Sequence, residues 1–141
     1  MKTLAIATMI SVVATAALAD SDHRKGTDGL TRLDYVVENT GADALSCDVK
    51  LAHWYSDHLA TVAPGAQGGF TLWADPGIGA VYLLNAAGDR MPVERLWCGL
   101  DGKSWETRHE VDPTGQAKLA LRCAATQITA TQAAATTCTA R

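Results

Sequence analysis

The clearest pattern of hydrophobic and polar positions covers residues 45–56, which read LSCDVKLAHWYS. Every second position from Leu45 to Tyr55 is apolar, a cysteine or His53, while most positions between them are polar. Side chains alternate between the two faces of an extended chain, so this pattern predicts one half-buried strand over residues 45–56. It also predicts that His53 faces the core.

Other extended stretches recur about every ten residues, and turns rich in glycine, proline, asparagine and aspartate separate them. They cover residues 33–38, 59–63, 70–74, 80–85, 91–98, 104–111 and 117–123. Pro64-Gly65 is typical of a type II turn, and Asp101-Gly102 of a tight hairpin turn. Seven or eight short strands without a helix predict an all-β domain over residues 32–123, namely a small antiparallel β-sandwich.

The order of these strands resembles the plan of immunoglobulin-like sandwiches. An aromatic strand leads through a turn to the strand of Cys47, and a Pro-Gly turn leads to a strand with Phe70 and Leu72. The resemblance implies two packed antiparallel sheets and carries no function with it. Trp54 follows Cys47 too soon for the family's core tryptophan, and no tyrosine stands two residues before Cys98 or Cys123.

The first 19 residues have the three parts of a cleavable signal peptide. A basic Met1-Lys2 start leads into an uncharged run over residues 3–18, and Ala17-Leu18-Ala19 offers small residues at the cleavage site. The alternative, a buried helix, would need an apolar stripe with a 3.6-residue period, which this run lacks. No second long apolar run follows, so we expect no transmembrane anchor after processing and a periplasmic or secreted protein.

Both ends of the predicted domain differ from it in composition. Residues 20–31 are polar with two glycines and predict a flexible leader. Residues 124–141 are nearly all alanine and threonine with some glutamine, and Cys138 lies close to their end. We expect a tail with little β-structure, laid over the sandwich and stapled to it by Cys138; a short alanine-rich helix is the alternative.

Four cysteines remain in the exported part of the chain: Cys47, Cys98, Cys123 and Cys138. An even number in an oxidising compartment predicts two disulfides, for which three connectivities are open. Strand phase places Cys47 and Cys98 toward the interior, which favours a bridge between them across the two sheets. Cys123 would then hold Cys138. A metal site would instead need closely spaced cysteine pairs, and none occur.

Net charge excludes some partners. The chain carries 12 Lys and Arg against 15 Asp and Glu, with both signs scattered along it. Such a distribution argues against nucleic acid or an anionic membrane surface as the partner. No cofactor signature occurs, so we expect no cofactor.

His53 and His58 are the first candidates for a metal site, with His23, His109 and Met91 as further possible ligands. The five-residue separation of His53 and His58 matches no established ligand spacing, so a core role for His53 is the favoured interpretation. A hydrolase would pair Ser56 or Ser104 with a histidine and an acid. No G-x-S-x-G turn occurs, so a polar strand end and turn over residues 55–58 is the favoured interpretation, and we expect no enzyme.

Four tryptophans provide the remaining functional signal. Trp54 lies in the polar phase of its strand, and Trp97 lies opposite in phase to Cys98. Exposed tryptophans close together mark a binding surface; the alternative is that these tryptophans pack beneath loops and the tail. We therefore predict a non-enzymatic module that binds or supports an envelope protein through Trp54, Trp97 and Trp105. The alternative is a metal- or small-ligand-binding protein that uses His53 and His58.

Overall fold

The computed structural model describes residues 24–114, 118–126 and 134–141. The predicted signal peptide, residues 1–19, lies outside these residues. An all-β fold is confirmed for the described part of the chain. Its strands are β1 (Thr31–Asn39), β2 (Leu45–Leu51), β3 (Ser56–Val62), β4 (Gln67–Ala74), β5 (Val81–Leu84), β6 (Arg90–Leu100), β7 (His109–Val111), β8 (Lys118–Thr126) and β9 (Ala135–Ala140).

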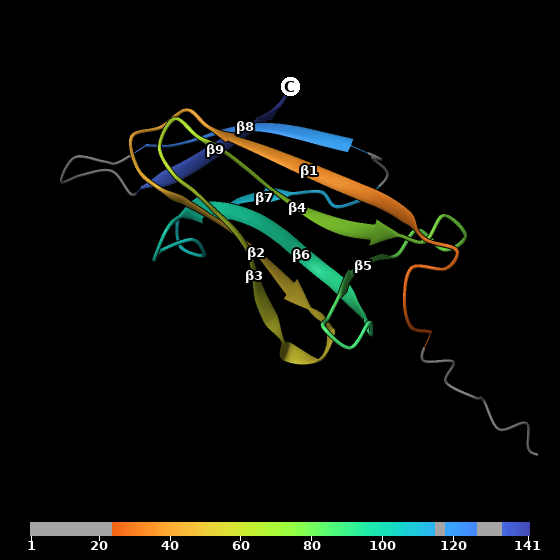
Figure 1. Cartoon of the computed structure of the whole chain (residues 1–141). Helices are drawn as coiled ribbons and strands as arrows, with labels where there is room; N and C mark the ends of the chain where they lie inside the picture. The colour runs from red at the N-terminus through yellow and green to blue at the C-terminus, as the bar shows by residue number, and fades with distance from the viewer. Residues whose placement is uncertain (1–23, 115–117, 127–133) are drawn as a thin grey trace, which may run out of the picture.

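The strands pair in the order β3-β2-β6-β5-β4-β1-β8-β9, and β7 pairs with β6. The first residues of β6 pair with β5, whereas its later residues pair with β2 and β7. The sheet therefore folds over at β6. In Figure 1, β1, β4, β8 and β9 form an upper layer, with β2, β3 and β6 below it.

The sheet is mixed, which corrects the prediction of a purely antiparallel arrangement. β1 pairs with β4 antiparallel but with β8 parallel, so that Val37 lies opposite Leu121. Turn residues indicate how strands adjacent in sequence pair, and here those hairpins are antiparallel as expected. β1 and β8 are far apart in sequence, and only packing of the whole chain decides their relative direction.

The strand predicted over residues 45–56 is shorter than expected. The register between β2 and β6 shifts between Lys50 and Leu51, and the chain then leaves the sheet in a single 3₁₀ turn, Ala52–Trp54. His53 and Trp54 adopt left-handed φ angles of 63° and 70°. The expectation of a core His53 was therefore wrong, because this residue is exposed in the turn that joins β2 to β3.

The alanine- and threonine-rich C-terminal segment also differs from expectation. Residues 135–140 form β9, which pairs antiparallel with β8, so this part is neither a tail poor in β-structure nor a helix. Threonine is β-branched and packs well in a pleated sheet. Thr136 and Cys138 face the interior from this strand, while its other side chains are exposed.

Both predicted disulfides are confirmed, Cys47–Cys98 and Cys123–Cys138. Each joins residues directly opposite one another on neighbouring antiparallel strands, with a Cα–Cα distance of 4.1 Å. The expectation that Cys47–Cys98 would cross between layers was wrong, because β2 and β6 are neighbours in the same layer. Each bridge therefore staples two adjacent strands.

The interior is built from alternate positions of the strands. Val37, Val49 and Leu72 are fully buried members of this core. Asn39, at the end of β1, is buried among them with no exposed surface. Its amide Nδ2 donates to the carbonyls of Asp43 and Val62, and its Oδ1 accepts from Gly41 N–H. A buried polar group is tolerated when its hydrogen bonds are made, and Asn39 here joins the ends of β1 and β3.

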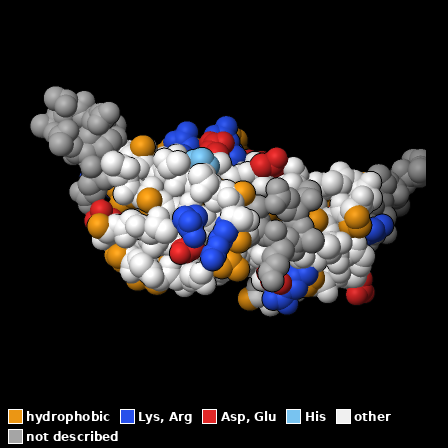
Figure 2. All heavy atoms as spheres, turned by 90° about the horizontal axis from the view of Figure 1, so that it is seen from above, with side chains coloured by type: hydrophobic (Ala, Val, Ile, Leu, Met, Phe, Trp, Pro, Cys, Tyr) orange, Lys and Arg blue, Asp and Glu red, His pale blue; other side chains and the backbone are white. Residues whose placement is uncertain are grey.

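Figure 2 shows the molecule from above, on the side of the upper layer, where acidic and basic side chains form small mixed groups. Glu38 on β1 accepts hydrogen bonds from Arg122 and Arg141, each at 3.3 Å. Exposed ion pairs of this kind stabilise a fold by less than about 1 kcal/mol. Among the described residues, the structure contains no helix that is long and apolar enough to cross a membrane.

Tyr35 gives the fold a testable dependence on alkaline pH. Its ring stacks on Phe70 with centroids 4.8 Å apart, and its hydroxyl donates to the carbonyl of Pro113. Burial raises the pKa of this hydroxyl to about 12, and the charge of Asp112 adds to the rise. The folded state therefore favours the neutral phenol, so the stability from this group is complete below pH 10 and declines between about pH 10 and 12.

We expect the free energy of unfolding to fall by about 3 kcal/mol across that interval, because each unit of pKa difference corresponds to about 1.4 kcal/mol. Urea denaturation at a series of alkaline pH values measures the fall. In Tyr35→Phe, which keeps the stacked ring and removes the ionisable group, this part of the fall should disappear. An equal fall in both proteins would contradict the assignment to Tyr35.

Candidate functional site

An open cleft of about 490 Å³ lies between β2, β3 and the loop that joins β6 to β7. Its lining combines three acidic side chains, two tryptophans, several serines, a histidine and a lysine. The lining residues are Ser46, Asp48, Ser56, Asp57, His58, Trp97, Gly102, Lys103, Ser104, Trp105 and Glu106. It brings together residues from β2, β3, β6 and the loop that follows β6.

Alternation along β2 decides which side chains reach the cleft. Cys47 and Val49 are buried in the core, so Ser46 and Asp48 project from the outer face of the lower layer. Trp97 on β6 lies directly opposite Asp48. Trp97 and Cys98 therefore point to opposite faces of β6, as predicted: Cys98 faces the core and Trp97 lies on the outer face.

The loop after β6 covers this outer face. Trp105 packs edge-on against Trp97 with ring centroids 5.1 Å apart, and only 6% of Trp97 remains exposed. Gly99 makes the close approach possible, because a Cβ atom at this position would overlap the Ser104 backbone, with the Ser104 Cα only 2.6 Å away. A glycine on β6 therefore lets the loop lie flat over the strand.

Asp48 is the centre of the polar network in the cleft. Its carboxylate accepts hydrogen bonds from the hydroxyls of Ser46 and Ser104, and it lies 2.8 Å from Nδ1 of His58. Trp97 Nε1 donates in turn to Ser104 Oγ at 3.3 Å. One carboxylate thereby connects β2, β3 and the covering loop.

The hydrogen bonds of His58 define its tautomer. A carboxylate only accepts, so Nδ1 carries the proton that points to Asp48. In the neutral ring, Nε2 then accepts from the Thr61 hydroxyl, which lies 3.0 Å away. Aspartate, histidine and hydroxyl follow one another here as in a hydrolase triad, but Thr61 does not line the cleft.

The serines named as candidate nucleophiles are placed differently. Ser104 donates to Asp48 rather than to a histidine, and Ser56 lies exposed on the rim of the cleft at the start of β3. Neither hydroxyl has a hydrogen bond to a histidine in the part of the chain that the structure describes. Ser104 thus connects the covering loop to Asp48 on β2.

Of the candidate metal ligands, His23 lies outside the described residues, and the described histidines His53, His58 and His109 are in no group of three or more potential ligands. Among described residues, the group of three or more potential ligands that the structure contains is Cys98, Cys123 and Cys138, without a histidine. Both nitrogens of His58 already contact Asp48 or Thr61, so a metal would have to displace one of them. A site formed by His53 and His58 stays a prediction.

The turn between β2 and β3 displays the most exposed aromatic side chains. We call residues 53–55 the aromatic turn. Trp54 is 94% exposed and Tyr55 is 61% exposed. Lys50 Nζ lies 5.6 Å from the Trp54 ring centroid and forms a 2.7 Å salt bridge with Glu94. Lys50 lies two residues after Asp48 on β2, so both side chains are on the same face of the strand. The aromatic turn, which Lys50 contacts, and the cleft, which Asp48 lines, therefore share this outer face.

Trp105 is the other exposed aromatic on this face, with 43% of its surface accessible. The guanidinium of Arg108 lies 3.9 Å from its ring centroid, and Arg108 donates to the Trp105 carbonyl. Of the three tryptophans predicted to form a patch, Trp97 and Trp105 meet, Trp97 is buried, and Trp54 stands apart on the aromatic turn. Tyr55 escaped the sequence analysis because the alternating pattern placed it on the buried side.

No protein-family model and no curated protein match this chain. A β fold by itself hosts many unrelated functions, so the function has to be inferred from the site.

Proposed function

We propose that this chain is an exported, non-enzymatic binding module with an immunoglobulin-like sandwich architecture, which docks onto another protein of the cell envelope. The aromatic turn and Trp105 provide the contact surface. Residues 1–19 serve as the signal peptide that delivers the module to the periplasm or beyond.

The exposure of Trp54 on a left-handed backbone carries this proposal. Two successive residues that are not glycine, His53 and Trp54, adopt positive φ angles, and each costs about 1 kcal/mol relative to glycine. The turn recovers little of this by burial, because Trp54 is 94% exposed. Local strain that burial does not offset is typical of functional segments.

The composition of the surface supports a protein partner. Tryptophan, tyrosine and arginine dominate the energetics of protein interfaces, and Trp54, Tyr55, Trp105 and Arg108 are all exposed on this face. Around them, ion pairs such as Lys50–Glu94 and Arg108–Glu110 provide both charges. Two confirmed disulfides agree with an oxidising compartment.

The cleft favours a second candidate, the binding of a small polar ligand. Its volume of about 490 Å³ lies in the range of small-molecule sites, and Asp48, Asp57 and Glu106 offer carboxylates beside Trp105. A cationic or hydroxyl-rich ligand would suit this lining. Asp48 is less available than the others, since three protein groups already surround its carboxylate.

Site-specific photo-crosslinking in cells tests the docking proposal. A photoreactive amino acid replaces Trp54 in one variant and Ile78 in another; Ile78 is a matched control because it is 74% exposed in the β4–β5 turn. We expect one defined protein adduct from position 54 and none from position 78. That adduct identifies the partner for binding measurements with purified proteins.

With the purified partner, Trp54→Gly should weaken binding about 10- to 100-fold, as expected for an exposed interface tryptophan. Its free energy of unfolding should stay unchanged or rise by about 1 kcal/mol, because glycine relieves the left-handed strain. Ile78→Ala should leave both quantities unchanged. Equal crosslinking at both positions, or full binding by Trp54→Gly, would refute docking through the aromatic turn.

A further inference from the structure

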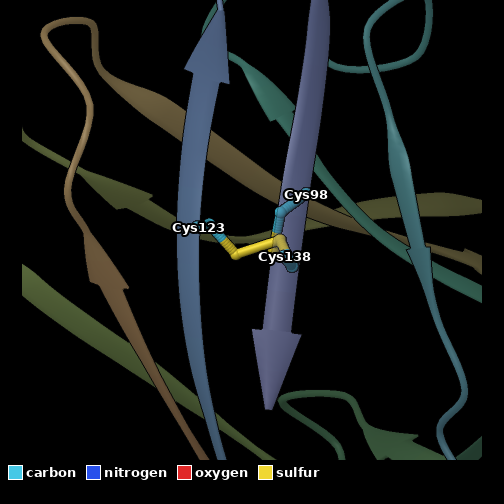
Figure 3. Close-up of side chains that lie close together, drawn as sticks. All are labelled: Cys98, Cys123 and Cys138. Carbon is cyan, nitrogen blue, oxygen red and sulfur yellow. A yellow bond between two sulfur atoms is a disulfide. The ribbon is translucent and has the colours of Figure 1, made fainter. Parts of the chain in front are cut away.

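The two disulfides meet in the interior. The sulfur atoms of Cys98, Cys123 and Cys138 all lie within 4.8 Å of one another. Figure 3 shows these three side chains gathered at one place. Cys98 belongs to the bridge of the lower layer, whereas Cys123 and Cys138 form the bridge of the upper layer. Stapling of neighbouring strands does not require such proximity, since each bridge joins its own strand pair.

We propose that these two disulfides form a single thiol–disulfide exchange centre whose co-substrate is an external dithiol reductant. In this centre the reductant opens Cys123–Cys138, and the thiolate released at Cys123 then opens Cys47–Cys98. The product of this exchange carries a new bridge, Cys98–Cys123, that connects the two layers.

The geometry makes Cys138 the first point of attack. Cys138 is 7% exposed, whereas Cys47, Cys98 and Cys123 have no exposed surface. β9 is the last strand in the pairing order, so it lies at an edge of the sheet. Strands at an edge open locally at low free-energy cost, so an external thiolate reaches Cys138 without global unfolding.

The sulfur and electron balance is complete in three displacements. A thiolate of the dithiol attacks the Cys138 sulfur, which forms a mixed disulfide and releases the Cys123 thiolate. This thiolate attacks the Cys98 sulfur, which forms Cys98–Cys123 and releases the Cys47 thiolate. The second thiol of the reductant then attacks the reductant's sulfur atom in the mixed disulfide. This step forms a disulfide within the reductant and frees Cys138 as a thiol. The dithiol is oxidised by two electrons, and the protein gains thiols at Cys47 and Cys138.

Proximity explains why the internal step competes with direct reduction of Cys47–Cys98. An external thiol has no access to this fully buried bridge in the folded state. A thiolate at Cys123 is already in place, and well-positioned intramolecular reactions gain large effective concentrations. Reduction of the lower bridge should therefore depend on the upper one.

A reduction time course on the native wild-type protein tests this. The protein is treated with dithiothreitol, quenched with an alkylating agent and digested with trypsin, which produces peptides 33–50, 96–103 and 123–141. In the native protein, 33–50 is joined to 96–103, and both upper cysteines lie within 123–141. We expect 96–103 to become joined to 123–141, with 33–50 and Cys138 alkylated, before full reduction.

The matched control combines Cys123→Ser with Cys138→Ser. Without an internal thiolate, reduction of Cys47–Cys98 should be about ten-fold slower or more than in the wild type. Native peptide pairs alone at every time point of the wild-type series would overturn the proposal. So would equally fast reduction of Cys47–Cys98 in a folded control variant. The wild-type series needs no substitution and decides the question even if the control variant does not fold.

Discussion

Replacement of Cys47 and Cys98 together by alanine is expected to lower the free energy of unfolding by about 4 kcal/mol. The bridge closes a loop of 51 residues, and loops of this length restrict the unfolded chain by about this amount. Most small domains are stable by only about 5 to 15 kcal/mol, so the loss is a large fraction of the total. Urea denaturation followed by circular dichroism, with and without the substitutions, measures it.

The second bridge is the internal control. Cys123 and Cys138 are 15 residues apart, so their joint replacement by alanine should cost about 3 kcal/mol. The order of the two losses distinguishes chain entropy from other contributions, because all four sulfur atoms are buried in the same core. A larger loss from the Cys123 and Cys138 pair would show that loop length does not decide their contributions.

Gly99→Ala is expected to cost about 3 kcal/mol and to displace the loop over the cleft. The added methyl group would overlap the backbone of Ser104, so either β6 or the loop has to move. Displacement separates Ser104 from Asp48 and Trp105 from Trp97. Near-ultraviolet circular dichroism, which reports the coupling of the two indole rings, should lose intensity along with the stability.

Gly102→Ala is the matched control within the same loop. Gly102 has a φ of 75°, and a Cβ atom there would meet nothing within 4 Å. This substitution should cost about 1 kcal/mol from the left-handed backbone alone and leave the Trp97–Trp105 signal intact. If both variants behave alike, the close approach at Gly99 does not hold the loop in place.

The loop prediction also separates the two candidate functions. Displacement of Ser104 and Trp105 alters the cleft, whereas Trp54 lies on another segment, the aromatic turn. A small polar ligand bound in the cleft would therefore lose affinity in Gly99→Ala. Docking that depends mainly on Trp54 would lose much less.

Local signals in the sequence predicted the all-β fold and favoured the cysteine pairing that the structure contains. The alternation over residues 45–51 and the turns at Pro64-Gly65 and Asp101-Gly102 depend on neighbours within a few residues. The alternation along each strand placed Cys47 and Cys98 toward the core and favoured the bridge between them, although the two strands are neighbours in one layer. These features follow from local backbone geometry, which a single sequence expresses directly.

Contacts between distant segments escaped the sequence for one shared reason. The parallel pairing of β1 with β8, the strand β9 and the meeting of the two disulfides depend on how the complete chain packs. The cleft has the same origin, because Asp48, His58 and Ser104 come from three separate segments. Neither the hydrophobic periodicity of a strand nor the spacing of residues along the chain indicates that these distant segments come into contact.

The aromatic turn shows where local signals end and tertiary structure begins. The alternating pattern continues through residues 52–56, and by itself it predicts more strand with His53 and Tyr55 buried. A shift in register against β6 ends the strand at Leu51 and exposes the turn instead. The sequence alone thus determined an all-β chain with two disulfides, through side-chain alternation, turn chemistry and cysteine phase. Only the tertiary structure decided which aromatic residues face solvent, because exposure depends on partner strands that local sequence does not specify.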